Sequence, residues 1–378
     1  MKRQPCHRDQ LLSVLLLIGL TLSACTAPES PEATLKSAFA ESFMVGAALN
    51  EAQFSGQAVD EAAIVMKHFN TITPENTLKW ESVHPEPDSF NFGPADAYVS
   101  FGEENGMFIV GHALVWHHQT PQWVFQDENG EDVDRETLLN TMQNHILTVV
   151  GRYKGRIDGW DVVNEALNDD GTLRETAWLR IIGDDYIAKA FEYAREADPD
   201  VQLYYNDYSL PDRPKRDGTV ALITNLQERG IDVAGVGLQG HYKLTSPGVA
   251  QLDSSIAAFA AMGVDVMITE LDIDVLPAAW EHRGADLSLD VELHDALNPY
   301  TEALPDSMQH VLATRYAELF GVFQKNADVV TRVTFWGVTD QASWLNSWPV
   351  EGRTSYPLLF DRSNNPKHAY DMVIAVAG

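Results

Sequence analysis

The chain has 378 residues, 45% of them hydrophobic, with 26 basic and 55 acidic residues and a net charge of −29. This apolar content, without repeats or long polar tracts, predicts a globular protein and excludes a disordered or fibrous one. An acidic surface repels phosphate groups, so we expect no nucleic acid as a partner.

Residues 1–24 are predicted to be a signal peptide rather than part of the fold. Basic residues precede an apolar stretch from Leu11 to Leu22, which is too short to cross a bilayer comfortably. The stretch ends in Leu22-Ser23-Ala24-Cys25, which resembles the processing site of bacterial lipoproteins. This resemblance implies cleavage before Cys25 and acylation of its thiol. An ordinary signal peptide with a cysteine near its cleavage site is the alternative.

A lipid on Cys25 would anchor the exported protein to the bacterial cell envelope. Thr26 follows the cysteine, and the lack of an aspartate there favours the outer membrane, on its periplasmic or surface face. Because Cys6 would be removed with the signal peptide, Cys25 would be the only thiol of the mature chain, which excludes an internal disulfide. Residues 25–37 are rich in proline, serine and charge and predict a short tether, and residues 38–378 predict one folded domain.

In residues 38–378, short apolar runs alternate with segments of helical period, which is typical of α/β proteins with a parallel sheet. Helices are predicted at Asp60–His68, Arg135–Tyr153, Ile187–Asp198 and Met308–Asn326. Strands are predicted at Phe43–Leu49, Thr71–Thr73, Phe108–Leu114, Ile157–Val163, Val201–Tyr205, Val233–Leu238, Val266–Glu270 and Val333–Gly337. This series predicts a (β/α)8 TIM barrel.

Polar or aromatic side chains lie at or just beyond the end of each predicted strand. They are Asn50, Glu75 and Asn76, His112, Asn164 and Glu165, Asn206 and Asp207, Gln239 and His241, Glu270, and Trp336. Because the C-terminal ends of the strands carry the active site in such barrels, we expect these side chains to meet in one cleft.

Two of these side chains are glutamates that end long apolar runs. Glu165 closes the run that begins at Ile157, and Glu270 closes the run that begins at Val264. Two carboxyl groups held on rigid strands across a cleft are what the cleavage of a glycosidic bond requires, one as acid and base and the other as nucleophile. The sequence therefore predicts a glycosidase.

Motifs between about residues 40 and 375 resemble glycoside hydrolase family 10, the retaining endo-β-1,4-xylanases. They are Thr73–Trp80, Gly111–Gln119, Trp160–Glu165, Tyr205–Tyr208, Gly237–Tyr242, Ile268–Asp272 and Thr334–Asp340. The resemblance implies that the domain is catalytic and hydrolyses internal bonds of xylan and xylo-oligosaccharides with retention, through a covalent glycosyl-enzyme. It implies neither a cofactor nor a metal, and we expect a monomer.

The same resemblance implies roles for individual residues. Glu270 would be the nucleophile and Glu165 the acid/base, with the carboxyl groups about 5 to 5.5 Å apart. The pKa of Glu165 would be raised, and we expect repulsion from the ionised Glu270 to raise it. Asn164 would bond the sugar 2-hydroxyl, and His241, with its tautomer fixed by Asp272, would orient the nucleophile.

Further residues are expected to bind the sugars. The floor on the glycone side would consist of Glu75, Asn76, Lys79, His112, Trp116, Gln119 and Gln239. Trp336 and Trp344 would cover the same subsites, because sugar rings present apolar faces that stack on indole. Tyr205, Asn206 and Tyr208 would border the leaving-group side.

Two alternatives stay open at this point. The same fold and mechanism could act mainly on aryl β-glycosides, cello-oligosaccharides or β-glucan, or the chain could be a non-catalytic surface glycan-binding lipoprotein. Lys79 and Trp344 bear on the first alternative, because a crowded glycone floor excludes the hydroxymethyl group of glucose. The segment from Leu276 to about Ser307 is long for a loop of this fold, and it could form a rim over the aglycone side or a packed excursion.

Overall fold

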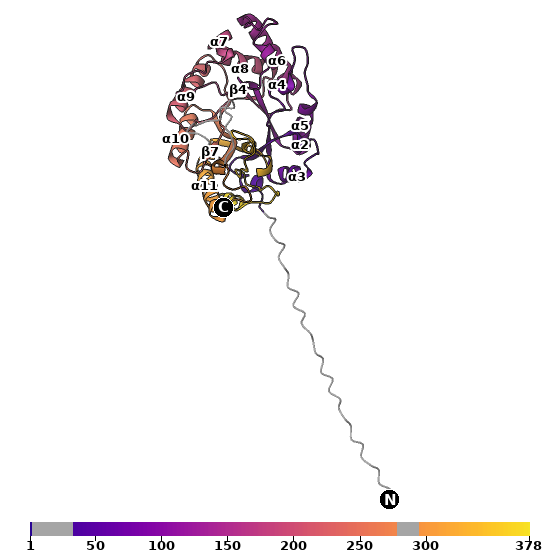
Figure 1. Ribbon diagram of the computed structural model, residues 1–378, viewed down its shortest axis with the longest axis vertical. Helices are drawn as coiled ribbons and strands as arrows, with labels where there is room; N and C mark the ends of the chain where they lie inside the picture. The colour runs from indigo at the N-terminus through magenta and orange to yellow at the C-terminus, as the bar shows by residue number, and fades with distance from the viewer. Residues whose placement is uncertain (2–32, 278–294) are drawn as a thin grey trace. The chain divides into compact units, whose positions relative to one another are not determined.

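Parallel strands close into a barrel in the computed structural model, which describes residue 1 and residues 33–277 and 295–378. Within these residues the barrel strands are β1 Met44–Leu49, β2 Thr71–Pro74, β3 Phe108–Val115, β4 Gly159–Asn164, β5 Gln202–Asp207, β6 Gly235–Leu238, β8 Asp265–Asp274 and β9 Val330–Phe335. Each pairs with its neighbour in parallel, and β6–β8 and β1–β9 pairing closes the ring (Figure 1). The predicted (β/α)8 barrel is confirmed.

Helices cover the outside of this ring (Figure 1). In the described part of the chain the α-helices are α1 Leu35–Ala38, α2 Glu51–Phe54, α3 Val59–His68, α4 Trp80–Val83, α5 Gly93–Glu104, α6 Arg135–Arg152, α7 Ala177–Ile182, α8 Tyr186–Ala197, α9 Arg213–Glu228, α10 Val249–Ala260, α11 Asp306–Lys325 and α12 His368–Ala377. Short 3-10 helices span Gln122–Val124, Asp295–Leu297, Asp340–Ala342 and Trp344–Asn346.

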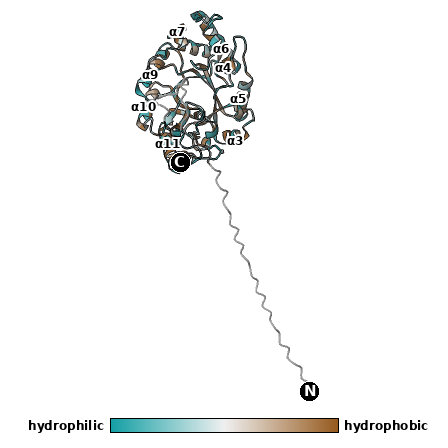
Figure 2. Cartoon of the chain, in the orientation of Figure 1, coloured by the Kyte–Doolittle hydropathy of each residue, from teal (hydrophilic) through white to brown (hydrophobic). Residues whose placement is uncertain are grey.

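The outer helices pack on the barrel through an apolar face. In α8, the buried residues Ile187, Ala190, Phe191 and Ala194 recur every three or four positions and face the barrel. Figure 2 shows the resulting mixture of hydrophobic and hydrophilic residues along the outer helices. The predicted helices therefore follow from hydrophobic periodicity alone.

Strand boundaries differ from the prediction mainly at β8, which runs to Asp274 instead of ending at Glu270. The short strand β7 His241–Lys243 explains the extension, because it pairs with β8 from Asp272 onward. Hydrophobic pattern did not predict this three-residue strand. Register shifts also interrupt β4 near Val163 and β8 between Ile268 and Leu271, so each catalytic glutamate predicted above lies beside an irregularity of its strand.

The folded unit begins at Ala33, earlier than the predicted boundary at residue 38. Thr34 caps the short helix α1, and Leu35 is fully buried. Tyr370 near the C-terminus donates its hydroxyl to Ala33 O at 2.9 Å. The end of the predicted tether is thus part of the domain, whereas Cys25 and all of the predicted signal peptide after residue 1 lie outside the described residues.

The long segment after β8 is described only at its two ends. Leu276, Leu297 and Leu304 are buried, and Tyr300 O accepts a hydrogen bond from Tyr356 at 2.6 Å. These ends are therefore packed against the domain. Residues 278–294, which include the centre of the predicted rim or excursion, lie outside the described residues.

Of the helices in residues 33–277 and 295–378, none combines the length and the apolar character needed to span a bilayer.

Candidate active site

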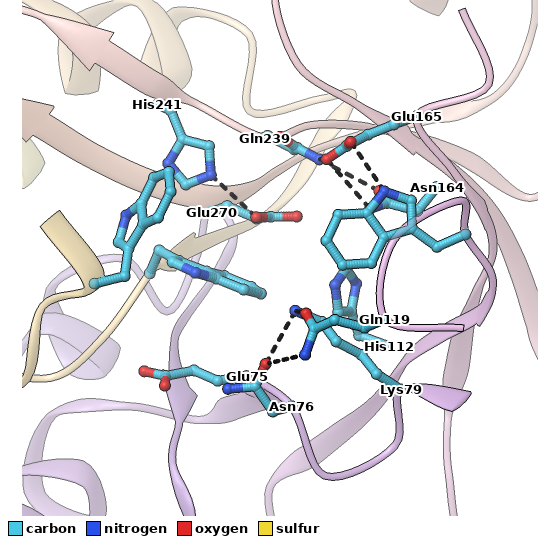
Figure 3. Close-up of a pocket in the computed structure, with 13 residues that line it drawn as sticks. Glu75, Asn76, Lys79, His112, Gln119, Asn164, Glu165, Gln239, His241 and Glu270 are labelled. Atoms are coloured by element: carbon cyan, nitrogen blue, oxygen red, sulfur yellow. Dashed lines mark hydrogen bonds and ion pairs between the residues drawn. The ribbon is translucent and has the colours of Figure 1, made fainter. Parts of the chain in front are cut away.

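A cleft opens at the C-terminal ends of the barrel strands, with about 600 Å³ of empty space that is partly open to solvent. Its described lining consists of Glu75, Asn76, Lys79, His112, Trp116, Gln119, Asn164, Glu165, Gln239, His241, Glu270, Trp336 and Trp344. Every one of these residues was singled out from the sequence. Figure 3 shows Glu165 and Glu270 on one side of the cavity and Glu75 and Asn76 on the other.

Glu165 follows strand β4 with its side chain buried in the cleft wall. Its Oε2 accepts a hydrogen bond from Trp116 Nε1 at 2.9 Å, and its Oε1 accepts one from Gln239 Nε2 at 2.9 Å. The backbone is in the left-handed region, at a φ of 58°. A residue with a Cβ rarely adopts this conformation, and such residues cluster at functional sites.

The pKa of Glu165 is raised, as expected, but for a different main reason. Burial is the largest cause, and the negative charge of Asp207 comes next. The hydrogen bonds from Gln239 and Trp116 oppose the shift, and repulsion from Glu270 contributes less than any of these. The environment of Glu165 therefore favours the protonated acid, mostly because water is excluded.

Glu270 lies within strand β8, and its pKa is shifted in the opposite direction. Its Oε1 accepts a hydrogen bond from Asn206 Nδ2 at 2.7 Å, and its Oε2 lies 3.1 Å from His241 Nε2. Burial raises the pKa of Glu270, but His241, His112 and Asn206 together outweigh burial and lower it. Glu270 is therefore a carboxylate near neutral pH.

His241 bridges two carboxylates. Its Nε2 faces Glu270, and its Nδ1 lies 3.0 Å from Asp272 Oδ2. Burial lowers the pKa of His241, but Asp272 and Glu270 outweigh burial and raise it to about 10. This pKa favours an imidazolium that donates from both nitrogens, a form that leaves no tautomer for Asp272 to fix. Asp272 supports it from behind the cleft lining.

Asn206, predicted to border the leaving-group side, lies outside the described cleft lining and joins the two halves of the site. It is fully buried, and its Nδ2 donates to Glu270 Oε1 and, at 3.0 Å, to Asn164 Oδ1. Thr269 Oγ1 donates to Asn206 Oδ1 at 2.6 Å, which fixes the orientation of the amide. Asn164 Nδ2 in turn lies 3.3 Å from Glu165 Oε1. A continuous hydrogen-bonded chain therefore connects the two glutamates.

The glycone floor is a polar cluster centred on Lys79. Lys79 Nζ donates to Gln119 Oε1 at 2.9 Å and to Asn76 Oδ1 at 3.2 Å, and it lies 4.8 Å from the ring centroid of Trp116. Burial lowers the pKa of Lys79, while Glu270, Glu165 and Glu75 act against burial. These groups present donors and acceptors to the cleft, as sugar hydroxyls require.

Glu75 supplies the carboxyl group of the floor, and the pKa of this group is perturbed. Burial raises its pKa to about 7, with Lys79 acting against the shift and Glu61 adding to it. Glu75 therefore changes charge near neutral pH.

His112 is oriented by a partner that the sequence did not single out. Its Nδ1 lies 2.8 Å from Asp161 Oδ2, and both side chains are buried. The two residues face each other across strands β3 and β4. The sequence did contain a signal for this partner, because Asp161 is a charged residue inside an apolar strand run. The ring of Trp336 packs edge-on against His112, with centroids 5.4 Å apart.

The structure does not bring Tyr205 into the described cleft lining. This side chain is fully buried, and its hydroxyl donates to Asp207 Oδ2 at 2.5 Å. Tyr208 is also buried and absent from that lining, and its hydroxyl accepts a hydrogen bond from Arg174 Nη2 at 2.6 Å. The sequence placed both tyrosines at the leaving-group side and indicated Asp207 only as one of the polar residues at strand ends, while Arg174 was not singled out.

Among the described residues, no group of three or more His, Cys, Asp or Glu side chains could hold a metal ion.

Comparison with known proteins identifies sequence relatives of this chain. The family model described as glycosyl hydrolase family 10 matches residues 34–376. Endo-1,4-beta-xylanase A of Xylanibacter ruminicola is 42% identical over 357 residues, which cover 94% of this chain and 97% of that protein. Beta-1,4-xylanase of Dictyoglomus thermophilum is 41% identical over 363 residues, covering 94% and 96%.

Solved structures are similar over the same range. A GH10 endoxylanase retrieved from a sugarcane soil metagenome is 42% identical, with a TM-score of 0.86 over 91% of this chain and 99% of that one. A mutant structure in complex with xylotriose is 37% identical, with a TM-score of 0.80 over 90% of this chain and 99% of that one.

Proposed function

Because this chain belongs to glycosyl hydrolase family 10, we propose that it is an endo-1,4-β-xylanase that hydrolyses internal β-1,4-xylosidic bonds of xylan with retention of configuration. The observation that carries this proposal is the opposite pKa shifts of two glutamates in one cleft. The pKa of Glu165 is raised, mainly by burial, whereas that of Glu270 is lowered because His241, His112 and Asn206 outweigh burial. Two carboxyl groups whose environments separate their pKa values are suited to the separate roles of acid and nucleophile.

In the first step, the carboxylate of Glu270 attacks the anomeric carbon of the bound sugar. The bond from that carbon to the glycosidic oxygen breaks, and Glu165 gives its proton to the departing oxygen. The positive charge of His241, which faces Glu270 Oε2, holds the nucleophile ionised and in place. The product is a xylosyl ester of Glu270 and a shortened xylan chain.

In the second step, Glu165 acts as a base. The ester neutralises the charge of Glu270, and Glu165, which lost its proton in the first step, takes a proton from a water molecule. That water attacks the anomeric carbon from the side that the leaving group vacated, so the configuration is retained. Glu165 recovers its proton and Glu270 its charge.

The floor of the cleft supports xylose as the preferred unit. Lys79, Asn76 and Gln119 hold one another through hydrogen bonds, so their positions are fixed before the sugar binds. Trp336 and Trp344 line the same cleft and offer apolar surfaces to sugar rings. Preorganised floor groups leave little freedom to accommodate the hydroxymethyl group of glucose. Xylo-oligosaccharides are therefore the proposed ligands of this floor.

We also propose that the enzyme works as a monomer exported to the cell envelope and anchored there by a lipid on Cys25. The proposal is supported by the sequence Leu22-Ser23-Ala24-Cys25 after a short apolar stretch. The outer membrane, on its periplasmic or surface face, is the proposed site.

Product analysis tests the proposed reaction. Incubation with xylan should release xylo-oligosaccharides whose new reducing ends appear first as the β-anomer in proton NMR spectra, while barley β-glucan should be cleaved much more slowly. Glu165→Ala should lose activity on xylan but keep activity on aryl xylosides whose leaving group needs no proton, and azide should rescue it with formation of a β-xylosyl azide. First appearance of the α-anomer, or equal rates on the two polysaccharides, would refute the proposal.

A further inference from the structure

A buried ion pair lies behind the acid/base glutamate, outside the described cleft lining. Asp207 ends strand β5 and Lys215 lies in the first turn of α9, and both side chains are 0% exposed. Asp207 Oδ1 and Lys215 Nζ are 2.8 Å apart. Removing two charges from water can cost more free energy than their attraction returns, so a buried ion pair is weak evidence for a stabilising role. The contacts of this pair indicate another role.

The carboxylate of Asp207 is connected to the backbone next to Glu165. Tyr205 donates its hydroxyl to Asp207 Oδ2 at 2.5 Å, and the same hydroxyl accepts a hydrogen bond from Ala166 N at 3.2 Å. The backbone N–H of Tyr208 donates to the other oxygen, Asp207 Oδ1, at 2.9 Å. A path of two hydrogen bonds therefore runs from Asp207 through Tyr205 to the residue that follows the acid/base.

This path ends at Ala166, next to the unfavourable backbone conformation of Glu165. Glu165 has a φ of 58°, a conformation that is unfavourable for any residue with a Cβ. The backbone N–H of Glu165 donates to Asn206 O at 2.9 Å, and its carbonyl accepts from Arg174 Nε at 3.2 Å. Together with the bond from Ala166 N to Tyr205, these contacts hold the peptide groups on both sides of Glu165.

Asp207 also acts on Glu165 through its charge. After burial, that charge is the largest cause of the raised pKa of Glu165, ahead of the repulsion from Glu270. The other charged or titratable groups that face Glu165 are Lys79, Arg174 and Tyr208. Those that face Asp207 or its lysine partner are Tyr186, Tyr205, Tyr208, Arg174 and Asp169.

We propose that Tyr205 and Asp207 are positioning residues for the acid/base step. Tyr205 holds Glu165 in its left-handed conformation, and the charge of Asp207 favours the protonated form of the Glu165 carboxyl group. Lys215 makes it possible to bury the charge of Asp207 at this site. The inference rests on the assignment of Glu165 as acid/base in the proposed function.

The first test replaces the charge and keeps the shape. In Asp207→Asn, the pKa of Glu165, followed by ¹³C NMR of the labelled side-chain carboxyl, should fall below its wild-type value, since a like charge transmitted through the protein interior is removed. The basic limb of the kcat/KM profile on xylo-oligosaccharides should move to lower pH by the same amount, because that limb reports the essential acid. Asp169→Asn is the matched control. It removes an exposed carboxylate 3.7 Å from the same Lys215 and should leave both readouts in place.

Asp207→Asn removes the buried counter-charge of Lys215, which leaves only the exposed Asp169 near it and could prevent folding. The double variant Asp207→Asn/Lys215→Met removes both charges together, and it should fold and show the shift in the same direction.

The second test removes the backbone support and keeps the charge. Tyr205→Phe should lower kcat severalfold with little change in KM, while the basic limb stays where it is in the wild type. If the network were purely structural, every variant would have a lower melting temperature, and the basic limb of its kcat/KM profile would stay where it is in the wild type.

Two results would overturn the inference. One is an unchanged titration of Glu165 in the folded Asp207 variants, and the other is an unchanged kcat in Tyr205→Phe. Failure of the proposed function would look different, because Glu165→Ala would then keep its activity on xylan. The NMR titration of Glu165 does not depend on activity and would still report the influence of Asp207.

Discussion

Trp344 and Asp272 are joined by a hydrogen bond from the indole Nε1 to Asp272 Oδ2, at 2.7 Å. The same oxygen lies 3.0 Å from His241 Nδ1, and the other nitrogen of His241 faces Glu270. The ring of Trp344 also packs against His241 at a tilt of 53°, with centroids 4.9 Å apart. The aromatic cover of the sugar site is thus tied to the group that holds the nucleophile.

This arrangement makes Trp344 the residue with which to test sugar specificity. A group of about one methylene in a fitted pocket changes kcat/KM by about 10- to 200-fold. Matched aryl glycosides of xylobiose and cellobiose should therefore differ by at least about 10-fold in favour of xylobiose, and Trp344→Ala should narrow the gap. Equal kcat/KM values in the wild type would instead support the β-glucan alternative.

His241→Gln should lower kcat without unfolding the protein. Outer partners of reacting groups commonly contribute about 10- to 100-fold to activity, as known from metal sites, and His241 holds Glu270 from one side and is itself held by Asp272. Steady-state kinetics on xylan and on an activated aryl xyloside check this, with circular dichroism as the control for folding. An unchanged kcat on both substrates would show that His241 has a structural role only.

The raised pKa of His241 also predicts how stability depends on pH. Because Asp272 and Glu270 outweigh burial and raise the pKa of His241 from 6.5 to about 10, its charged form stabilises the fold fully below about pH 6.5, and this contribution disappears as the pH rises through 10. The difference in melting temperature between the wild type and His241→Gln should be constant below pH 6.5 and shrink between pH 6.5 and 10. A difference that persists undiminished above pH 10 would contradict the assignment of an imidazolium.

Glu75 should make sugar binding depend on pH near neutrality. Burial raises its pKa to about 7, so the carboxyl group becomes ionised as the pH rises through 7. An ionised oxygen accepts stronger hydrogen bonds from hydroxyl groups than a neutral one, so affinity for xylo-oligosaccharides should increase across this range. Calorimetric titrations in a Glu270→Ala background, which prevents hydrolysis, would measure it. Adding Glu75→Gln should flatten the dependence, and an identical slope with and without that substitution would assign it to another group.

Acylation of Cys25 predicts where the protein is found. The wild type should partition into detergent and fractionate with membranes, and Cys25→Ser should be released or fail to mature. Two or more acyl chains on one residue hold a protein stably, whereas one chain is marginal. Intact mass spectrometry of an unmodified chain that begins at or after residue 25 would refute the anchor.

The sequence was sufficient to predict the barrel and the residues that line its cleft. Apolar runs predicted strands because buried parallel strands are apolar on both faces, and the residues at their ends had to meet because the strands are parallel. Glu165, Glu270 and Lys79 are therefore found where strand order places them.

The features that the sequence did not predict depend on contacts between segments distant in the chain. The left-handed backbone of Glu165 is contacted by Arg174 and, through Ala166, by Tyr205, and the raised pKa of His241 comes from the charges of Asp272 and Glu270. Asp207 looked like one more polar residue after a strand, because nothing local shows that Lys215 is buried beside it. Hydrophobic pattern predicts which residues approach one another but not their conformation or charge state.

The central claim is that Glu270 forms a covalent bond to the sugar while Glu165 supplies and removes the proton. Trapping with a 2-deoxy-2-fluoro-β-xylobioside of an activated phenol tests it most directly, because the fluorine slows both steps and the good leaving group restores the first. Mass spectrometry of the inactivated enzyme should show one added fluoroxylobiosyl group, located by peptide mapping on Glu270 and absent from Glu270→Ala. A label on any other residue, or none in an enzyme that still hydrolyses xylan, would contradict the account.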